Sequence, residues 1–108
     1  MIAAAAAALA LVTASSPITQ ARAGRTFHVG RHGALTLRLS ERWLWTEPRV
    51  STAAVELTPV EYFRDPGFRE WRVVARAPGR ATIRSRGTPA CSGCGDSPRS
   101  FAVMVVVG

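Results

Sequence analysis

Short stretches in which apolar and polar side chains alternate follow one another along most of the chain. Residues 35–40 place leucines at every second position, which is the period of a strand with one buried and one solvated face. The same period occurs at 71–76 and 81–86, where arginines take polar positions. Apolar stretches at 26–29, 43–45, 54–57 and 101–107 complete the set of expected strands. These segments predict an all-β domain.

Proline and glycine mark the connections between these strands. Pro59 predicts the end of the fourth strand, because proline cannot donate a hydrogen bond to a β-ladder. Residues 65–67 read Asp-Pro-Gly, a tight-turn sequence within a loop. Residues 78–79 read Pro-Gly and predict a β-hairpin between the two arginine-bearing strands. Glycine, proline and serine predict a long loop at 87–100.

The number and spacing of the strands favour one architecture. About seven short strands at near-regular spacing, with no helical period between them, are typical of an immunoglobulin-like antiparallel β-sandwich. A small β-barrel is the alternative. The chain after residue 23 has about 85 residues, which is enough for one modest hydrophobic core. We therefore expect a single immunoglobulin-like β-sandwich domain over residues 24–108.

An alanine-rich apolar stretch opens the chain. Residues 2–12 are alanine, leucine, isoleucine and valine without interruption, which suits the apolar region of a signal peptide and is too short for a membrane span. Pro17 breaks a helix, and Ala21 and Ala23 supply the small residues that a signal peptidase recognises. The sequence therefore predicts a signal peptide at 1–23, removed after Ala23.

The predicted signal peptide implies a protein that is secreted or held in the cell envelope, with no transmembrane anchor after cleavage. No basic residue precedes Arg22, whereas signal peptides open with a positive charge. Two alternatives therefore stay open, a disordered low-complexity start and a gene start that lies further upstream.

The net charge is +7, and all 14 basic residues are arginine. The arginines are spread along the chain, whereas tails that bind nucleic acid concentrate them in blocks. We interpret Trp43, Trp45 and Trp71 as core residues and not as a platform for stacking bases. We therefore expect solvated arginines and no nucleic-acid partner, and an affinity for anionic surfaces stays open.

Cys91 and Cys94 are the two cysteines of the chain and lie in the predicted long loop. In an exported protein such a pair predicts a disulfide. A redox dithiol is a second interpretation, although no helix follows that would lower the pKa of a thiol. A metal site is the third, and it would need further ligands such as His28, His32 or Asp96.

No group of residues points to catalysis. The carboxylates are scattered, no Gly-x-Ser-x-Gly sequence is present, and no glycine-rich phosphate loop precedes a helix. We therefore predict a protein that is not an enzyme, with no catalytic residue, no cofactor and no metal ligand assigned.

Four segments occur in a familiar order. They are 35–39 with a tryptophan soon after, Phe68–Ala75, Pro78–Ile83 and the apolar Phe101–Val107. This order resembles the chagasin-like proteinase inhibitors and, more broadly, bacterial immunoglobulin-like domains. The resemblance implies a secreted immunoglobulin-like domain that blocks papain-type cysteine peptidases. The inhibitory loop sequences of that family are not matched by the corresponding residues 40–45, 64–67 and 86–91.

Alternate loops of an immunoglobulin-like sandwich gather at one end, so three loops are expected to form one binding face. The candidate binding residues are Glu41, Arg42, Arg64, Asp65, Gly67, Pro89 and Asp96. Tyr62, Phe63 and Phe68 flank the middle loop, either as anchors for a partner or as packing beneath it.

We thus predict a non-enzymatic binding module with a protein partner, for which a cysteine peptidase is the candidate. The alternative is a metal-binding or redox-active exported protein that uses Cys91 and Cys94.

Overall fold

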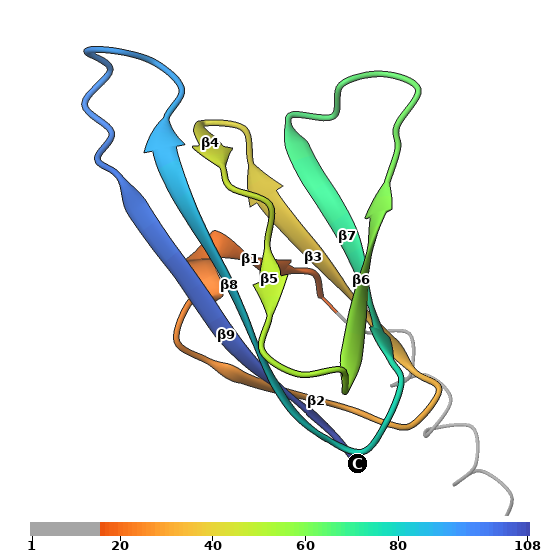
Figure 1. The fold of residues 1–108 in the computed structure, drawn as a ribbon. Coiled ribbons are helices and arrows are strands. Elements are labelled where there is room, and N and C mark those ends of the chain that lie inside the picture. Colours follow the sequence, from red (N-terminus) through yellow and green to blue (C-terminus); the bar gives the residue numbers. More distant parts are fainter. Residues whose placement is uncertain (1–15) are drawn as a thin grey trace, which may run out of the picture.

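The computed structural model describes residues 16–108, and within this range the chain forms nine β-strands and one 3-10 turn, Gln20–Arg22. The strands form two sheets around a common core (Figure 1). The predicted β-sandwich is confirmed, although we expected about seven strands. The two additional strands, β1 (Ile18–Thr19) and β5 (Arg49–Val50), have two residues each, so the sequence contains no alternation that would reveal them.

The first sheet has the strand order β1-β3-β7-β6. The antiparallel pair of β3 (Ala34–Ser40) and β7 (Phe68–Ala75) forms its centre. β6 (Val55–Val60) pairs with the other side of β7, also antiparallel. β1 runs parallel to β3 and extends the opposite edge.

The second sheet has the strand order β2-β9-β8-β4. Its strands are β2 (Thr26–Val29), β9 (Arg99–Val107), β8 (Gly79–Pro89) and β4 (Trp43–Trp45). β5 also pairs with β8. The long strands pair antiparallel as predicted, whereas β1 and β2 each run parallel to a neighbour, so both sheets are mixed.

β7 and β8 do not form the predicted hairpin. β7 belongs to the first sheet and β8 to the second, so residues 76–78 carry the chain across the sandwich. The amides of Arg76 and Ala77 both donate to the carbonyl of Ala54, at 2.8 and 3.2 Å. The prediction was wrong because alternation identifies the buried face of a strand and not the strand that lies beside it.

Pro59 lies inside β6 and not beyond its end. β6 is an edge strand whose partner in the described residues is β7. An edge strand has one side without a ladder, and a proline nitrogen can face that side without the loss of a hydrogen bond. The strand therefore continues to Val60.

Side chains from both sheets form one core. Trp71 and Phe101 are the largest fully buried side chains. Trp43 and Trp45 are buried as predicted, with ring centroids 6.0 Å apart. The Trp45 ring lies against Gly87, where an added β-carbon would come within 2.9 Å of it. A glycine is therefore required where β8 passes beneath this ring.

The core includes a residue that precedes the predicted cleavage point. Ile18 is 1% exposed, and the side-chain oxygen of Gln20 accepts a hydrogen bond from the Ser40 amide at 3.0 Å. Cleavage after Ala23 stays a prediction, and it would remove both contacts from the sandwich. The apolar stretch 2–12 lies outside the described residues. Within the described range, no helix is long and apolar enough to cross a membrane.

Candidate functional site

Three loops lie at one end of the sandwich, opposite the C-terminus (Figure 1). They are the β3–β4 turn with Glu41 and Arg42, the β6–β7 loop at 61–67 and the β8–β9 loop at 90–98. We call these three segments the loop face. The candidate residues belong to it except Pro89, which is part of β8 and pairs with Trp43. The β8–β9 loop is thus shorter than the predicted 87–100, because β8 and β9 extend into that range.

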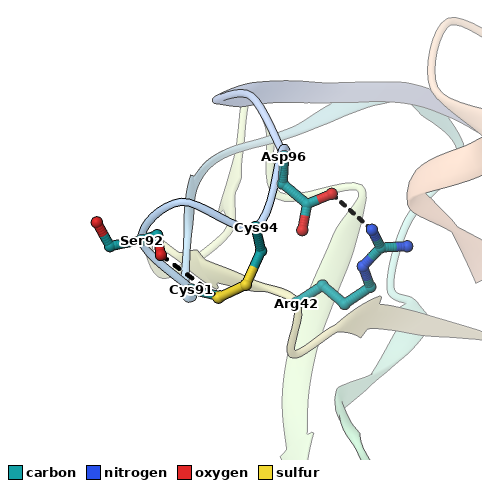
Figure 2. The surroundings of a disulfide bond; sticks show 5 residues. All are labelled: Arg42, Cys91, Ser92, Cys94 and Asp96. Carbon is teal, nitrogen blue, oxygen red and sulfur yellow. Dashed lines mark hydrogen bonds and ion pairs between the residues drawn. A yellow bond between two sulfur atoms is a disulfide. The ribbon is translucent and has the colours of Figure 1, made fainter.

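An ion pair joins the β3–β4 turn to the β8–β9 loop. Arg42 Nη2 lies 2.5 Å from Asp96 Oδ1, and Figure 2 shows the two side chains pointing toward each other. The Ala90 amide donates to the Arg42 carbonyl at 2.9 Å. The Trp43 indole N–H donates to the Ser97 carbonyl at 2.8 Å. Hydrogen bonds to Arg42 and Trp43 therefore hold both ends of the β8–β9 loop.

A disulfide between Cys91 and Cys94 closes the tip of the same loop (Figure 2). The predicted disulfide is confirmed, and both cysteines lie at the surface. The metal and redox alternatives receive no support. The two sulfurs are bonded to each other, and no group of three metal-ligating side chains occurs within residues 16–108. His28 and His32 are separate from this loop, on β2 and in the turn that follows.

The β6–β7 loop is fastened to the same turn from the other side. The Glu41 amide donates to the Gly67 carbonyl at 3.0 Å. The Gly67 amide in turn donates to Asp65 Oδ1 at 2.9 Å. Gly67 has φ +85°, a conformation that glycine adopts without strain, and this explains why glycine follows Pro66. The β3–β4 turn thus stands between the two longer loops and contacts both.

The carboxyl groups of Glu41 and Asp65 interact within the loop face. A hydrogen bond with Asp65 raises the pKa of Glu41 above its ordinary value. The hydrogen bond from the Gly67 amide, followed by that from Glu41, lowers the pKa of Asp65. Asp65 therefore carries its charge to lower pH than usual, while Glu41 holds its proton to higher pH.

Tyr62 and Phe68 pack against each other beside the β6–β7 loop. Their rings meet edge to face at 5.6 Å. The Tyr62 hydroxyl donates to Glu70 Oε1 at 2.6 Å, and Arg38 Nε donates to the same oxygen at 2.7 Å. The Arg38 guanidinium also lies 4.6 Å from the centre of the Phe68 ring. Of the two interpretations of these aromatic residues, packing therefore applies to Phe68, whereas Tyr62 packs against Phe68 and is also 43% exposed.

Phe63 differs from its aromatic neighbours because its side chain is fully exposed, at 101%. Leu44 on β4 is 65% exposed. Together with Trp43, Trp45 and Arg69 it lines an open hollow of about 310 Å³ next to the β3–β4 turn. The sequence contained the signal for Leu44, since a strand that buries the tryptophans on either side must point the leucine outward.

No protein-family model matches the sequence, and no curated protein matches it either. Solved structures do match. The cysteine protease inhibitor EhICP2 from Entamoeba histolytica is 19% identical, with a TM-score of 0.64 over 85% of this chain and 93% of that one. Amebosin is 14% identical, with a TM-score of 0.56 over 87% and 98% of the two chains.

A third structure, PbICP-C in complex with falcipain-2, is 12% identical, with a TM-score of 0.52 over 87% of this chain and 91% of that one. At these identities the similarity is one of fold. The described chain has the immunoglobulin-like fold of the chagasin-type cysteine protease inhibitors.

Proposed function

We propose that this protein is a non-enzymatic inhibitor of papain-type cysteine peptidases and that it binds the enzyme with its loop face. One observation carries the proposal: in a chagasin-like fold, an ion pair and hydrogen bonds join the three loops at one end to one another. The Arg42–Asp96 ion pair joins two of them, and the hydrogen bond from Glu41 to Gly67 joins the third. Solved structures with this fold include a cysteine protease inhibitor and a protein in complex with falcipain-2.

Fastened loops suit a binding protein because they lose little conformational freedom when the partner binds. A loop that is mobile in the free protein must be ordered in the complex, and the entropy lost weakens binding. Here the disulfide between Cys91 and Cys94 and the hydrogen bond from Trp43 to Ser97 already restrict the longest of the three loops. The loop face is therefore organised before it meets a partner.

Phe63 and Leu44 are the side chains that we expect to contribute most to binding. Both are large, apolar and exposed. Such side chains contribute to affinity when a partner removes them from water, and aromatic residues are frequent among the residues that dominate interfaces. We expect Phe63 to enter the substrate cleft of the peptidase and Leu44 to contact the cleft wall.

The proposed mode of inhibition is steric. The loop face would occupy the substrate cleft and keep peptide substrates out, and no bond between inhibitor and enzyme would form or break. Glu41 and Asp65 would serve as hydrogen-bonding groups at the edge of the contact, since their carboxyl groups lie at the surface.

The proposed location is outside the cytoplasm, in the cell envelope or secreted. Two features support it: the apolar stretch at residues 2–12, which has the length of a signal-peptide core, and the surface disulfide. Disulfides persist in oxidising compartments.

Complex formation with papain tests the proposal. The protein is mixed with active papain and, separately, with papain whose cleft is occupied by a covalent active-site inhibitor, and complexes are separated by size. We expect a complex with the active enzyme and none with the blocked enzyme. An equal amount of complex with both would place the contact outside the cleft, and no complex with active papain would refute the proposal.

A further inference from the structure

One face of the second sheet carries a row of arginines. Along β8, Ala81, Ile83 and Ser85 are buried, so the residues that alternate with them point outward. The outward residues include Arg80, Arg84 and Arg86. Arg49 on β5 lies directly opposite Arg84 in the register and is also exposed. We call Arg49, Arg80, Arg84 and Arg86 the cationic face.

The arginines of the cationic face have no acidic partner among the described residues. The ion pairs of the described chain instead use Arg38, Arg42, Arg69 and Arg76. Like charges directly opposite each other on neighbouring strands, such as Arg49 and Arg84, are unfavourable. An anionic ligand from outside the chain would remove this repulsion.

An open hollow of about 570 Å³ lies within this face. Arg49, Arg84 and Arg86 line it, together with Ala102, whereas the side chain of the bordering Phe101 is buried in the core. Thr46 and Ser100 add hydroxyl groups, whereas Ser85 is buried and its hydroxyl already donates to the Thr46 carbonyl.

The one carboxylate among the described lining residues is Glu47. It already accepts hydrogen bonds from Arg69 at 3.1 Å and from the Trp71 indole at 3.2 Å. The hollow thus combines cationic donors with hydroxyl groups and the small apolar side chain of Ala102.

We propose that the cationic face binds a linear acidic polysaccharide, one that carries carboxylate or sulfate groups. Guanidinium groups bind such anions through two parallel hydrogen bonds. Outward residues repeat about every 6–7 Å along a strand, so an extended charged polymer can meet several arginines in turn. The site lies along the strands and does not depend on the proposed inhibition.

The same face is less suited to other anions. Proteins that bind single-stranded nucleic acid stack bases on exposed aromatic side chains. In the described chain the exposed aromatic residues are Tyr62 and Phe63, which lie on the β6–β7 loop and not on this face. Membrane-surface segments likewise use aromatic or large apolar residues beside their basic ones.

Calorimetry with heparin oligosaccharides as the probe tests the proposal. One variant combines Arg49→Gln, Arg84→Gln and Arg86→Gln. The matched control combines Arg25→Gln, Arg31→Gln and Arg72→Gln, which removes the same charge from exposed arginines elsewhere. We expect the first variant to bind at least about tenfold more weakly and the control to change affinity less than about threefold. Circular dichroism checks that both variants are folded, and Arg84→Gln alone replaces the first variant should it not fold.

Three results would overturn the proposal. One is heparin binding that is weakened equally in both variants, which would indicate attraction by net charge alone. Another is no binding of heparin by the wild-type protein. The third is tighter binding of the wild-type protein to anionic phospholipid vesicles or to an oligothymidylate than to heparin, if the first variant loses that binding. This result would assign the cationic face to a membrane or to nucleic acid. Peptidase inhibition should stay unchanged in the first variant, so failure here and failure of the inhibitor proposal are distinguishable.

Discussion

Arg42 and Asp96 lie 54 positions apart in the sequence and form an ion pair that connects two segments of the loop face. The Arg42 side chain is largely exposed, whereas Asp96 is mostly covered. Exposed ion pairs contribute little to global stability, so the pair's main effect is local. It restricts the β8–β9 loop and holds it against the turn that carries Glu41.

Asp96→Asn should therefore loosen the loop without unfolding the domain. We expect the free energy of unfolding to fall by less than about 1 kcal/mol, because surface ion pairs rarely contribute more. Amide hydrogen exchange at residues 90–98 should become faster, as measured by mass spectrometry. Glu56→Gln is the control, since it breaks the Arg76–Glu56 pair away from the loop face. Equal exchange in this loop for both variants would contradict the role given to Asp96.

Ile18 should be required for full stability. Its side chain is buried beside Leu37, so Ile18→Ala leaves a cavity and should lower the free energy of unfolding by about 2–4 kcal/mol. Ala21→Gly, at an exposed position, is the control. A chain of residues 24–108 should be destabilised at least as much, relative to residues 16–108, because it also lacks the bond from Ser40 to Gln20. Denaturant unfolding is measured for residues 16–108, for its Ile18→Ala and Ala21→Gly variants, and for residues 24–108. Equal unfolding midpoints for all four proteins would contradict the placement of β1.

Tyr62 is the single tyrosine of the chain, so tyrosinate absorbance reports on it alone. The hydrogen bond to Glu70 raises the pKa of Tyr62 above 10.0. A group whose pKa is raised by folding contributes stability below its unfolded pKa, and the contribution is lost as the pH rises through the folded value. Glu70→Gln should return the measured pKa toward 10.0, because the negative charge that opposes ionisation is removed. The same pKa in both proteins would contradict the Tyr62–Glu70 contact.

Gly87→Ala should be costly although alanine is small. The added carbon would lie 2.9 Å from both Trp43 and the Trp45 ring, so one of the tryptophans must move. Overpacking of this kind costs about 1–3 kcal/mol, to be measured by chemical unfolding, and the tryptophan fluorescence should change with it. Gly30→Ala is the matched control, because nothing lies within 4 Å of a β-carbon there. If the two variants are equally stable, the close packing of Trp45 on β8 is wrong.

The sequence predicted which residues face the core far better than which strands are neighbours. Alternation identified Leu37 and Ile83 as buried, because a half-buried strand must repeat every two residues. Alternation could not reveal that Pro78 and Gly79 connect the two sheets. A strand that buries one face shows the same alternation whichever of the two sheets it belongs to. Strands of two residues, such as Arg49–Val50, are too short to show a period.

The candidate site was predicted in part. The loop residues Glu41, Asp65 and Asp96 follow from the positions of the turns in the sequence, and the structure places them at one end. The contacts between them could not be predicted, because they depend on how strands far apart in sequence align. The sequence also did not separate Phe63, which is exposed, from Phe68, which packs against Tyr62.

Inhibition of papain by the wild-type protein and by two variants tests the central claim most directly. The first variant combines Leu44→Ala and Phe63→Ala, and the control, Val74→Ala, shortens an apolar side chain on the outer face of β7. We predict saturable inhibition by the wild type, a loss of at least about tenfold in affinity for the double variant, and a change of less than about twofold for the control. A folded wild-type protein that does not inhibit papain, or a double variant that inhibits as well as the control, would contradict the account.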